Sequence, residues 1–311
     1  MRDRVVIGSR GSELALWQTN HIADLLRSAA PGLAVEIEVV STRGDRILDK
    51  PLPEIGGKGV FTEELERALR DESIDLAVHS LKDLPVQEPD GLTIGAIPER
   101  ATPLDAIVAR NAASLAELPE GARVGTSSLR RKAQLLVKRP DLTIVDLRGN
   151  VETRIAKVLE KRELDAAVLA CAGLERLGLQ DVISEVLQPD VMLPAPGQGA
   201  LAIQCREDDG DLLELLAAID HGESRAEVTA ERALLQGLGG GCSAPIGALV
   251  QSGNDRVGVR CGVFGPPGMN SLRMAMALNN AKPPFDLDQI VAQMLESLRE
   301  RGADEILGYY R

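Results

Sequence analysis

The segment Arg123–Arg162 concentrates positive charge in a chain that is otherwise acidic. It holds eleven Lys or Arg against four Asp or Glu, whereas the whole chain carries a net charge of −12. The hydroxyl run Thr126–Ser128 can cap one helix that ends before Pro140, and Asn150 can cap a second. Each helix is expected to follow a short strand, so that free N–H groups, hydroxyls and arginines together favour an anion. The segment therefore predicts an anion-binding site, with a solvated basic face as the alternative from composition alone.

Polar side chains also follow two predicted strands near the N-terminus. The strand Arg4–Gly8 leads into Arg10 and a helix start, which again offers N–H groups and a guanidinium to an anion, unless Arg10 only forms a surface ion pair. The strand Asp75–Val78 leads into His79–Asp83, and ligands of open α/β sheets bind beyond the carboxyl ends of strands. A His, a Ser, a Lys and an Asp at one strand end indicate an acid–base cluster, although a single loop Asp more often caps a turn.

Two glycine-containing loops could carry chemistry as well. The loop Arg43–Gly59 is long and lacks both periodicity and the spacing of a phosphate-binding loop, which predicts a mobile lid with Lys58 as its cation. A predicted helix over Ala226–Leu238 ends in three glycines, which Cys242 follows directly. An exposed thiol without a nearby base favours covalent attachment of a group over nucleophilic turnover, and a simple loop cysteine is the alternative.

Composition narrows the class of protein. Aromatic residues make up only 2% of the 311 residues, which argues against single-stranded nucleic-acid binding, because that binding stacks bases on aromatic rings. The net negative charge argues against a protein-wide attraction to nucleic acid or to an anionic membrane. No apolar run approaches the length of a membrane span, and the N-terminus has no signal character. The four cysteines lack CxxC spacing, so we expect no metal site and a reduced, cytoplasmic protein. From the charge, the aromatic content and the lack of a long apolar run, we expect neither nucleic-acid nor membrane partners.

The order of the expected elements predicts three parts. Two similar α/β patterns are separated by proline-bearing crossovers at Pro98–Pro103 and Leu193–Gly199. A strand at Ala200–Cys205 is expected to return to the first α/β lobe. From Ala226 onward, a helix, three strand-like runs and a final amphipathic helix predict a small α+β domain. The predicted domains are residues 1–99 with 200–217, residues 100–199, and residues 218–311.

Taken together, these segments resemble the porphobilinogen deaminase family over essentially the whole chain. The resemblance rests on long motifs in a fixed order: GGKGVFTEELE, DLAVHSLKDLP, GTSSLRRKAQL, LRGNVETR, LPAPGQGA and ERALLQGLGGGCSAPIG. It implies two α/β lobes like those of type II periplasmic binding proteins, with a third, smaller α+β domain. It also implies a transferase of porphyrin and haem biosynthesis. Such an enzyme condenses four porphobilinogen molecules head to tail, releases ammonia at each addition, and hydrolyses the product to the linear tetrapyrrole hydroxymethylbilane.

The resemblance implies roles for individual residues. A dipyrromethane cofactor is expected on Cys242 through a thioether, and Asp83 is expected to be the catalytic residue. Cofactor binding is implied for Lys82, Asp83, Thr126, Ser127, Ser128, Arg130, Arg131, Arg148 and Gly149. Substrate binding is implied for Arg10, Ser12, Lys58, Arg148, Asn150, Arg154, Arg176 and Gln198. The resemblance further leads us to expect a monomer whose partner is its porphobilinogen substrate.

The chemistry of this product accounts for the arginines. Each pyrrole carries an acetate and a propionate, and Arg binds carboxylates through paired hydrogen bonds without losing its proton. Asp83 is suited to stabilise positive charge on pyrrole nitrogens and to move a proton, and Lys82 beside it helps to keep it ionised. Glu54 and Glu63 stand where several relatives carry lysine, which puts a substrate-attracting role of those two positions in doubt.

The alternative function is that of a two-lobed, non-catalytic anion-binding protein. Such a receptor needs neither the Cys242 loop nor a third domain, and these two features therefore distinguish the hypotheses.

Overall fold

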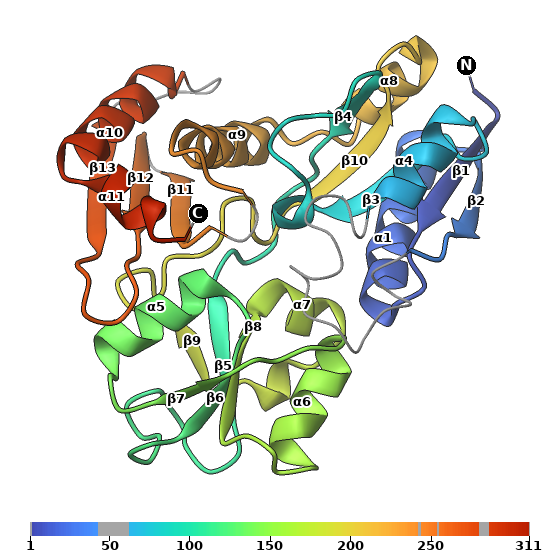
Figure 1. Ribbon diagram of the computed structural model, residues 1–311. Coiled ribbons are helices and arrows are strands. Elements are labelled where there is room, and N and C mark those ends of the chain that lie inside the picture. Colours follow the sequence, from blue (N-terminus) through green and yellow to red (C-terminus); the bar gives the residue numbers. More distant parts are fainter. Residues whose placement is uncertain (1, 43–61, 242–243, 254, 280–285, 311) are drawn as a thin grey trace. The chain divides into compact units, whose positions relative to one another are not determined.

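The computed structural model describes residues 2–42, 62–241, 244–253, 255–279 and 286–310, and the chain forms two compact units (Figure 1). The first unit consists of Met1–Arg100 and Ala200–Arg225, and the second of Ala101–Gly199 and Ala226–Arg311. The two predicted crossovers lie where the chain passes from one unit to the other. The division into three domains, with a boundary between residues 217 and 218, stays a prediction.

The first unit is built on one mixed sheet with the strand order β2-β1-β3-β10-β4. Strand β1 is parallel to β2 and β3, whereas β10 is antiparallel to β3 and β4. The strands are β1 (Arg4–Ser9), β2 (Ala34–Val39), β3 (Leu76–Ser80), β4 (Leu92–Ala96) and β10 (Leu201–Arg206). Because β10 comes from far along the sequence, the expected return of the chain to the first lobe is confirmed.

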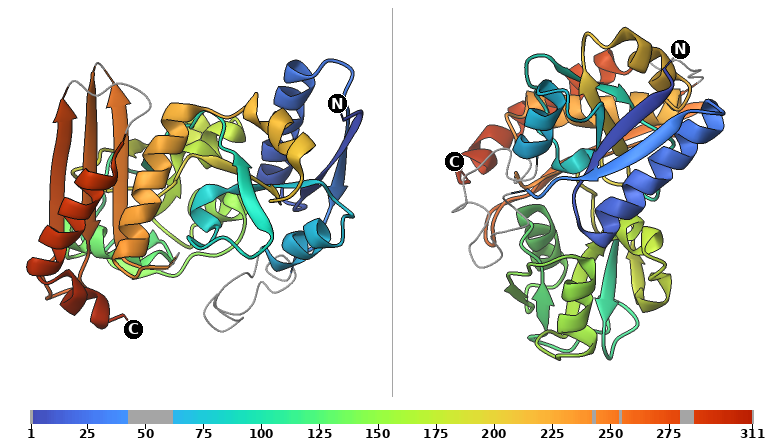
Figure 2. Two further views of the ribbon diagram at one scale, coloured as in Figure 1. Left: turned by 90° about the horizontal axis from the view of Figure 1, so that it is seen from above. Right: turned by 90° about the vertical axis from the view of Figure 1, so that its right-hand side faces the viewer.

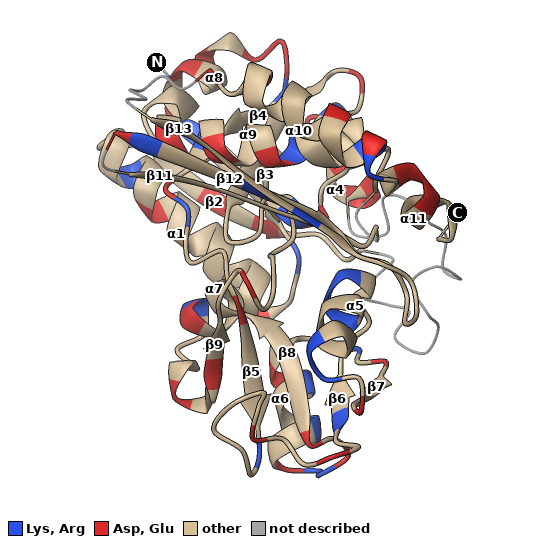
Figure 3. Ribbon diagram, turned by 90° about the vertical axis from the view of Figure 1, so that its left-hand side faces the viewer, with Lys and Arg blue, Asp and Glu red and all other residues tan. Residues whose placement is uncertain are grey.

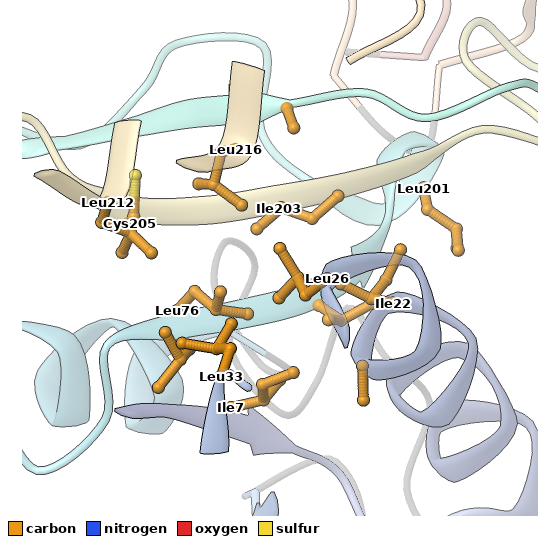
Figure 4. Packing of buried hydrophobic residues seen from close by; sticks show 14 residues of the cluster. Ile7, Ile22, Leu26, Leu33, Leu76, Leu201, Ile203, Cys205, Leu212 and Leu216 are labelled. Carbon is orange, nitrogen blue, oxygen red and sulfur yellow. The ribbon is translucent and has the colours of Figure 1, made fainter. Parts of the chain in front are cut away.

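Helices cover both faces of this sheet, because alternate strand residues point to opposite sides. The helices are α1 (Glu13–Ala29), α4 (Glu63–Arg70) and α8 (Gly210–Ala217), with a short 3-10 turn, η1 (Leu81–Asp83), after β3. On one face, α1 and α8 bury aliphatic side chains against the strands (Figure 4). The labelled members of that cluster are Ile7, Ile22, Leu26, Leu33, Leu76, Leu201, Ile203, Cys205, Leu212 and Leu216. On the other face, Leu65 and Leu69 of α4 pack with Ile74 and Leu92.

The second unit contains a sheet of the same arrangement, with the order β7-β6-β8-β5-β9. Strand β6 is parallel to β7 and β8, and β5 is antiparallel to β8 and β9. The strands are β5 (Asp105–Ala109), β6 (Arg123–Gly125), β7 (Thr143–Val145), β8 (Ala166–Ala170) and β9 (Glu185–Leu187). The helices are α5 (Leu129–Lys138), α6 (Val151–Leu159) and α7 (Cys171–Arg176), with the 3-10 turn η2 (Gln180–Val182).

Strand alternation again divides the core of this lobe between two faces. Ile107 of β5 packs on the face that Leu135 of α5 covers. Its neighbour Ala106 packs on the opposite face, with Ile155 of α6 and Leu174 of α7. Since the two sheets share one strand arrangement, the predicted pair of similar α/β lobes is confirmed.

The remainder of the second unit is a three-stranded antiparallel sheet with helices, of which the first, α9, begins with the last residues of the first unit; this part is seen from above in Figure 2. Its elements are α9 (Gly222–Gly237), β11 (Ile246–Gly253), β12 (Arg256–Val263), β13 (Leu272–Asn279), α10 (Asp288–Glu300) and α11 (Ala303–Gly308). The predicted smaller α+β domain is thereby confirmed. It contacts the second lobe, because Leu249 and Phe264 pack with Ala133 of α5 and with Leu193. None of the described helices combines the length and the apolar character that crossing a membrane requires.

Candidate active site

In the second unit, both predicted helix caps are present. Ser128 precedes α5, and its hydroxyl Oγ accepts a hydrogen bond from the backbone N of Arg131 at 3.4 Å. Asn150 precedes α6, and its Oδ1 accepts from the backbone N of Thr153 at 2.9 Å. The remaining N–H groups of the first turn of each helix have no intrahelical acceptor and carry the positive end of the helix dipole.

The two helix starts lie at the same edge of the sheet. Strands β6 and β7 are parallel neighbours, and the backbone N of Thr126, after β6, donates to Val145 O at the end of β7 (2.9 Å). Ser127 Oγ accepts from Leu147 N at 3.0 Å and donates to Leu147 O at 3.1 Å. These bonds join the loops after the two strands. The three adjacent hydroxyl residues therefore have different partners: Ser128 caps the helix, Ser127 joins the loops, and Thr126 Oγ1 accepts a hydrogen bond from Ser128 N at 3.2 Å.

A carboxylate that the sequence did not single out lies at this edge. Asp105 begins β5, is fully buried, and pairs in register with Ala170 at the end of β8. Arg130 Nη1 donates to Asp105 Oδ2 at 2.8 Å, and Arg131 donates to Oδ1 from Nη2 at 2.7 Å and from Nε at 3.1 Å. Gln198 Nε2 also donates to Oδ1, at 2.9 Å. The structure thus gathers three of the predicted binding residues around one buried acid.

The charges of this cluster do not cancel. Burial alone would raise the pKa of Asp105, but the charges and hydrogen bonds of Arg130 and Arg131 outweigh burial and hold that pKa well below its usual range. Burial lowers the pKa of the Arg130 guanidinium, although Asp105 opposes that effect. Two guanidiniums against one carboxylate leave an excess of one positive charge in a nearly water-free setting. Such a site is suited to a further anion.

Further guanidiniums belong to the same edge. Arg148 and Arg154, both half-buried, lie on either side of the N-cap of α6, and Arg154 Nε donates to Gly149 O at 2.8 Å. Gly149 has φ +113°, and a Cβ there would lie 2.7 Å from Thr153 Cγ2, so only glycine fits without strain. Figure 3 shows that Lys and Arg also gather on α5.

Arg176, at the end of α7, joins this edge to the crossover between the units. Its Nη2 donates to Gly199 O at 2.7 Å. Burial lowers the pKa of Arg176 to about 10, which still leaves it protonated at neutral pH. Gly199 has φ +88°, and a Cβ there would lie 2.4 Å from Ala101 O. The backbone of the crossover at Gly199 therefore passes so close to the backbone of Ala101 that a side chain at this position would not fit.

In the first unit, the predicted residues follow two parallel strands that end at one sheet edge. Arg10 and Ser12 follow β1, and Ser12 caps α1 by accepting from the backbone N of Ala15 at 3.3 Å. Lys82 and Asp83 follow β3 in η1, with Lys82 half-buried and Asp83 exposed. The exposed carboxylate is therefore accessible to a ligand.

His79, at the inner end of the predicted acid–base cluster, requires a correction. It lies in β3, is 7% exposed, and burial lowers its pKa to about 4. The ring is therefore neutral near pH 7 and does not serve as a proton donor there. Of the predicted cluster, Lys82 and Asp83 remain as the charged members.

Two predicted residues and one predicted loop fall outside the described residues. These are Lys58, Cys242 and the lid Arg43–Gly59.

Comparison with known proteins identifies the family. A family model described as "Porphobilinogen deaminase, dipyromethane cofactor binding domain" matches residues 5–214, and one described as "Porphobilinogen deaminase, C-terminal domain" matches residues 225–297. The chain belongs to the porphobilinogen deaminase family. The porphobilinogen deaminase of Roseiflexus sp. (strain RS-1) is 50% identical over 295 residues, which cover 95% of this chain and 96% of that protein. That of Pelotomaculum thermopropionicum is 49% identical over 307 residues, covering 99% of this chain and 97% of that protein.

Membership in the porphobilinogen deaminase family confirms the prediction of a polymerising transferase of porphyrin biosynthesis, and a non-catalytic anion-binding protein is not favoured. Among solved structures, the methionine-binding protein MetQ is 18% identical with a TM-score of 0.44, covering 74% of this chain and 96% of that protein.

The residues at the second-unit edge fit the cofactor of the porphobilinogen deaminase family. A dipyrromethane carries two acetates and two propionates, and the edge offers guanidiniums and helix N-termini in matching chemistry. The acid in contact with Arg130 and Arg131, Asp105, is already paired and does not repel these carboxylates as an unpaired charge would.

Proposed function

We propose that this chain condenses four porphobilinogen molecules head to tail into hydroxymethylbilane, using a dipyrromethane cofactor attached to Cys242. Family membership supports the reaction. The observation that carries the assignment of the site is the buried, net-positive cluster of Arg130, Arg131 and Asp105 beside two helix N-termini. A monomeric state and a cytoplasmic location are parts of the proposal that rest on the sequence.

The second-unit residues bind the carboxylates of the cofactor and of the growing chain. Arg131, Arg148, Arg154 and Arg176 lie at one edge, and each charge-assisted hydrogen bond contributes about 1.5–3 kcal/mol. Two carboxylates ~4 Å apart repel each other by about 4 kcal/mol at an intermediate dielectric constant. Two or three such bonds per ring therefore offset the repulsion that accumulates as rings are added. The loops and side chains that hold these arginines in place belong to the same edge. They are Thr126, Ser127, Ser128, Arg130, Gly149, Asn150 and Gln198.

The first-unit residues act on the reacting pyrroles. Arg10 and Ser12 hold substrate carboxylate beyond β1, and Lys58 adds a cation from the predicted lid. Asp83 accepts N–H groups of the pyrroles, stabilises positive charge on their nitrogens as ammonia leaves, and takes up the proton that the new carbon–carbon bond displaces. Lys82 adds a cation beside Asp83 in η1. The dipyrromethane, when bound, supplies the electron-rich terminal carbon to which the first porphobilinogen is joined.

The cysteines of the described part of the chain support Cys242 as the attachment point. Cys171, Cys205 and Cys261 are buried. Burial raises their pKa values, to about 12 for Cys171, about 11 for Cys205 and about 12 for Cys261. Protonated, enclosed thiols are poor nucleophiles, so none of these three is suited to covalent attachment.

Intact mass spectrometry with peptide mapping tests the proposal. Purified protein should be heavier than its sequence by two pyrrole units, all on the peptide that contains Cys242. Cys242→Ser should lack both the added mass and turnover, whereas Cys261→Ala, the matched control in the same domain, should retain both. Active wild-type protein of unmodified mass, or a Cys242→Ser variant that still turns over, would falsify the proposal.

A further inference from the structure

The crossover Leu193–Gly199 forms part of the arginine cluster. Leu193 O accepts a hydrogen bond from Arg130 Nη1 at 2.5 Å. Gln198 Nε2 donates to Asp105 Oδ1 at 2.9 Å. The position of the crossover therefore determines where two of the groups around the buried carboxylate lie.

The third domain holds the same crossover through a buried acid. Glu231 of α9 is fully buried. Its Oε2 accepts from the backbone N of Gly197 at 2.7 Å, and its Oε1 accepts from the backbone N of Val250 in β11 at 2.8 Å. Glu231 thus joins α9, β11 and the crossover, and the crossover residue it holds immediately precedes Gln198.

A second tie from the third domain reaches the same segment. Arg273 of β13 donates from Nη1 to Pro189 O at 2.9 Å, and from Nη2 to Gln134 Oε1 at 2.7 Å and Val191 O at 3.1 Å. Gln134 of α5 binds the backbone of Leu193 in both directions, at 2.8 Å to N and 3.1 Å to O. Polar contacts therefore run without interruption from the third domain to the arginine cluster.

We propose that Glu231 is a positioning residue of the reaction, which holds Gly197 so that Gln198 faces Asp105 and the arginines keep a fixed place relative to the third domain. The proposal rests on the proposed function, in which the cofactor is attached to the third domain while arginines of the second lobe bind its carboxylates. The cofactor can be attached to the third domain and bound by these arginines at the same time only if the distance between the third domain and the second lobe stays fixed. Burying a carboxylate costs desolvation free energy. Because Glu231 spends its two oxygens on backbone amides of separate elements, we infer that it fixes the position of the crossover relative to β11.

The test compares Glu231→Gln with Glu227→Gln, one turn earlier on α9. Glu227 Oε1 also binds β11, accepting from Ser252 N at 2.7 Å and from its Oγ at 2.6 Å. Glu227 thus joins α9 to β11, whereas Glu231 joins α9 to both β11 and the crossover. Assayed as mass-verified, cofactor-loaded protein well below its unfolding midpoint, Glu231→Gln should raise the KM for porphobilinogen on the order of tenfold. Glu227→Gln should leave KM unchanged.

A double-mutant cycle separates positioning from general stability. If Glu231 acts through Gln198, then Glu231→Gln should change KM no further in a Gln198→Ala background. If Glu231→Gln does not fold, Arg273→Met removes the second tie at a partly exposed position and should raise KM in the same way. A wild-type KM in loaded Glu231→Gln, or full additivity with Gln198→Ala, would overturn the inference. Where Glu231→Gln does not fold, a wild-type KM in loaded Arg273→Met would overturn it instead. Wild-type protein without added mass on Cys242 would instead refute the proposed function.

Discussion

Replacing Asp105 by Asn removes one charge from the buried cluster with little change in the size of the side chain. Asn has nearly the same size and keeps one oxygen acceptor. It loses the negative charge that faces Arg130 and Arg131, and its amide NH₂ group would oppose one of the donors that now bind the carboxylate. Two buried guanidiniums would then share no counterion in this cluster.

The size of the effect follows from the burial of all three groups. The Asp105 side chain is 0% exposed, and the Arg130 and Arg131 side chains are 4% and 9% exposed. Removing one partner of a buried ion pair costs about 3–5 kcal/mol, because it leaves an uncompensated charge. For a unit of this size, that cost lowers the unfolding midpoint by about 6–20 °C. Asp141→Asn is the matched control, since Asp141 pairs with Arg139 at 2.7 Å but is 26% exposed, and water therefore screens the loss.

The pH dependence of the difference in unfolding free energy between wild type and Asp105→Asn provides a sharper test. The pKa of Asp105 is depressed in the folded protein, so its charge stabilises the fold above its unfolded value of 3.8, and this contribution is lost as pH falls through the folded pKa. Urea unfolding of wild type and Asp105→Asn should therefore give a free-energy difference that is equal at about pH 7 and pH 5 and smaller near pH 3. An equal difference at all three pH values would refute the assignment of the stability to the ionised carboxylate.

Three further predictions concern single residues. Asp83→Asn should fold and carry the cofactor by intact mass, yet turn over about 10²–10³ times more slowly, because it loses a preorganised charge; a loss of only a few-fold would reduce Asp83 to a turn residue. The His79 ring should show no NMR titration near its ordinary pKa of 6.5, because burial lowers that pKa to about 4, and its neutral burial should cost stability as pH falls from 6.5 towards 4; a midpoint near 6.5 would contradict its burial. Gly149→Ala should lower the free energy of unfolding by at least about 1 kcal/mol, because of φ +113° and the contact with Thr153; an unchanged thermal midpoint would show that the loop adjusts.

Local sequence patterns predicted the elements that depend on near neighbours. Ser128 and Asn150 were predictable as caps, because a cap bonds to an amide three residues away and needs no tertiary partner. The excess of arginine between residues 123 and 162 likewise indicated an anion site before any fold was known. The order of the expected elements predicted the two lobes and the smaller α+β domain, and the motif resemblance supplied the family.

The tertiary structure alone decided which of these side chains meet. Asp105 contacts Arg130 and Gln198, which lie 25 and 93 residues away in the sequence, and no local pattern encodes that meeting. An Asp at the start of an apolar strand, DAIVA, was the one available signal, and it also fits an ordinary turn. His79 lies in β3, an interior strand between β1 and β10, and the folded chain buries it in the core rather than leaving it in the exposed cluster. The packing of segments that are distant in the sequence determines how deeply Asp105 and His79 are buried and which charged groups lie beside them. The protonation states of these two residues therefore depend on the fold.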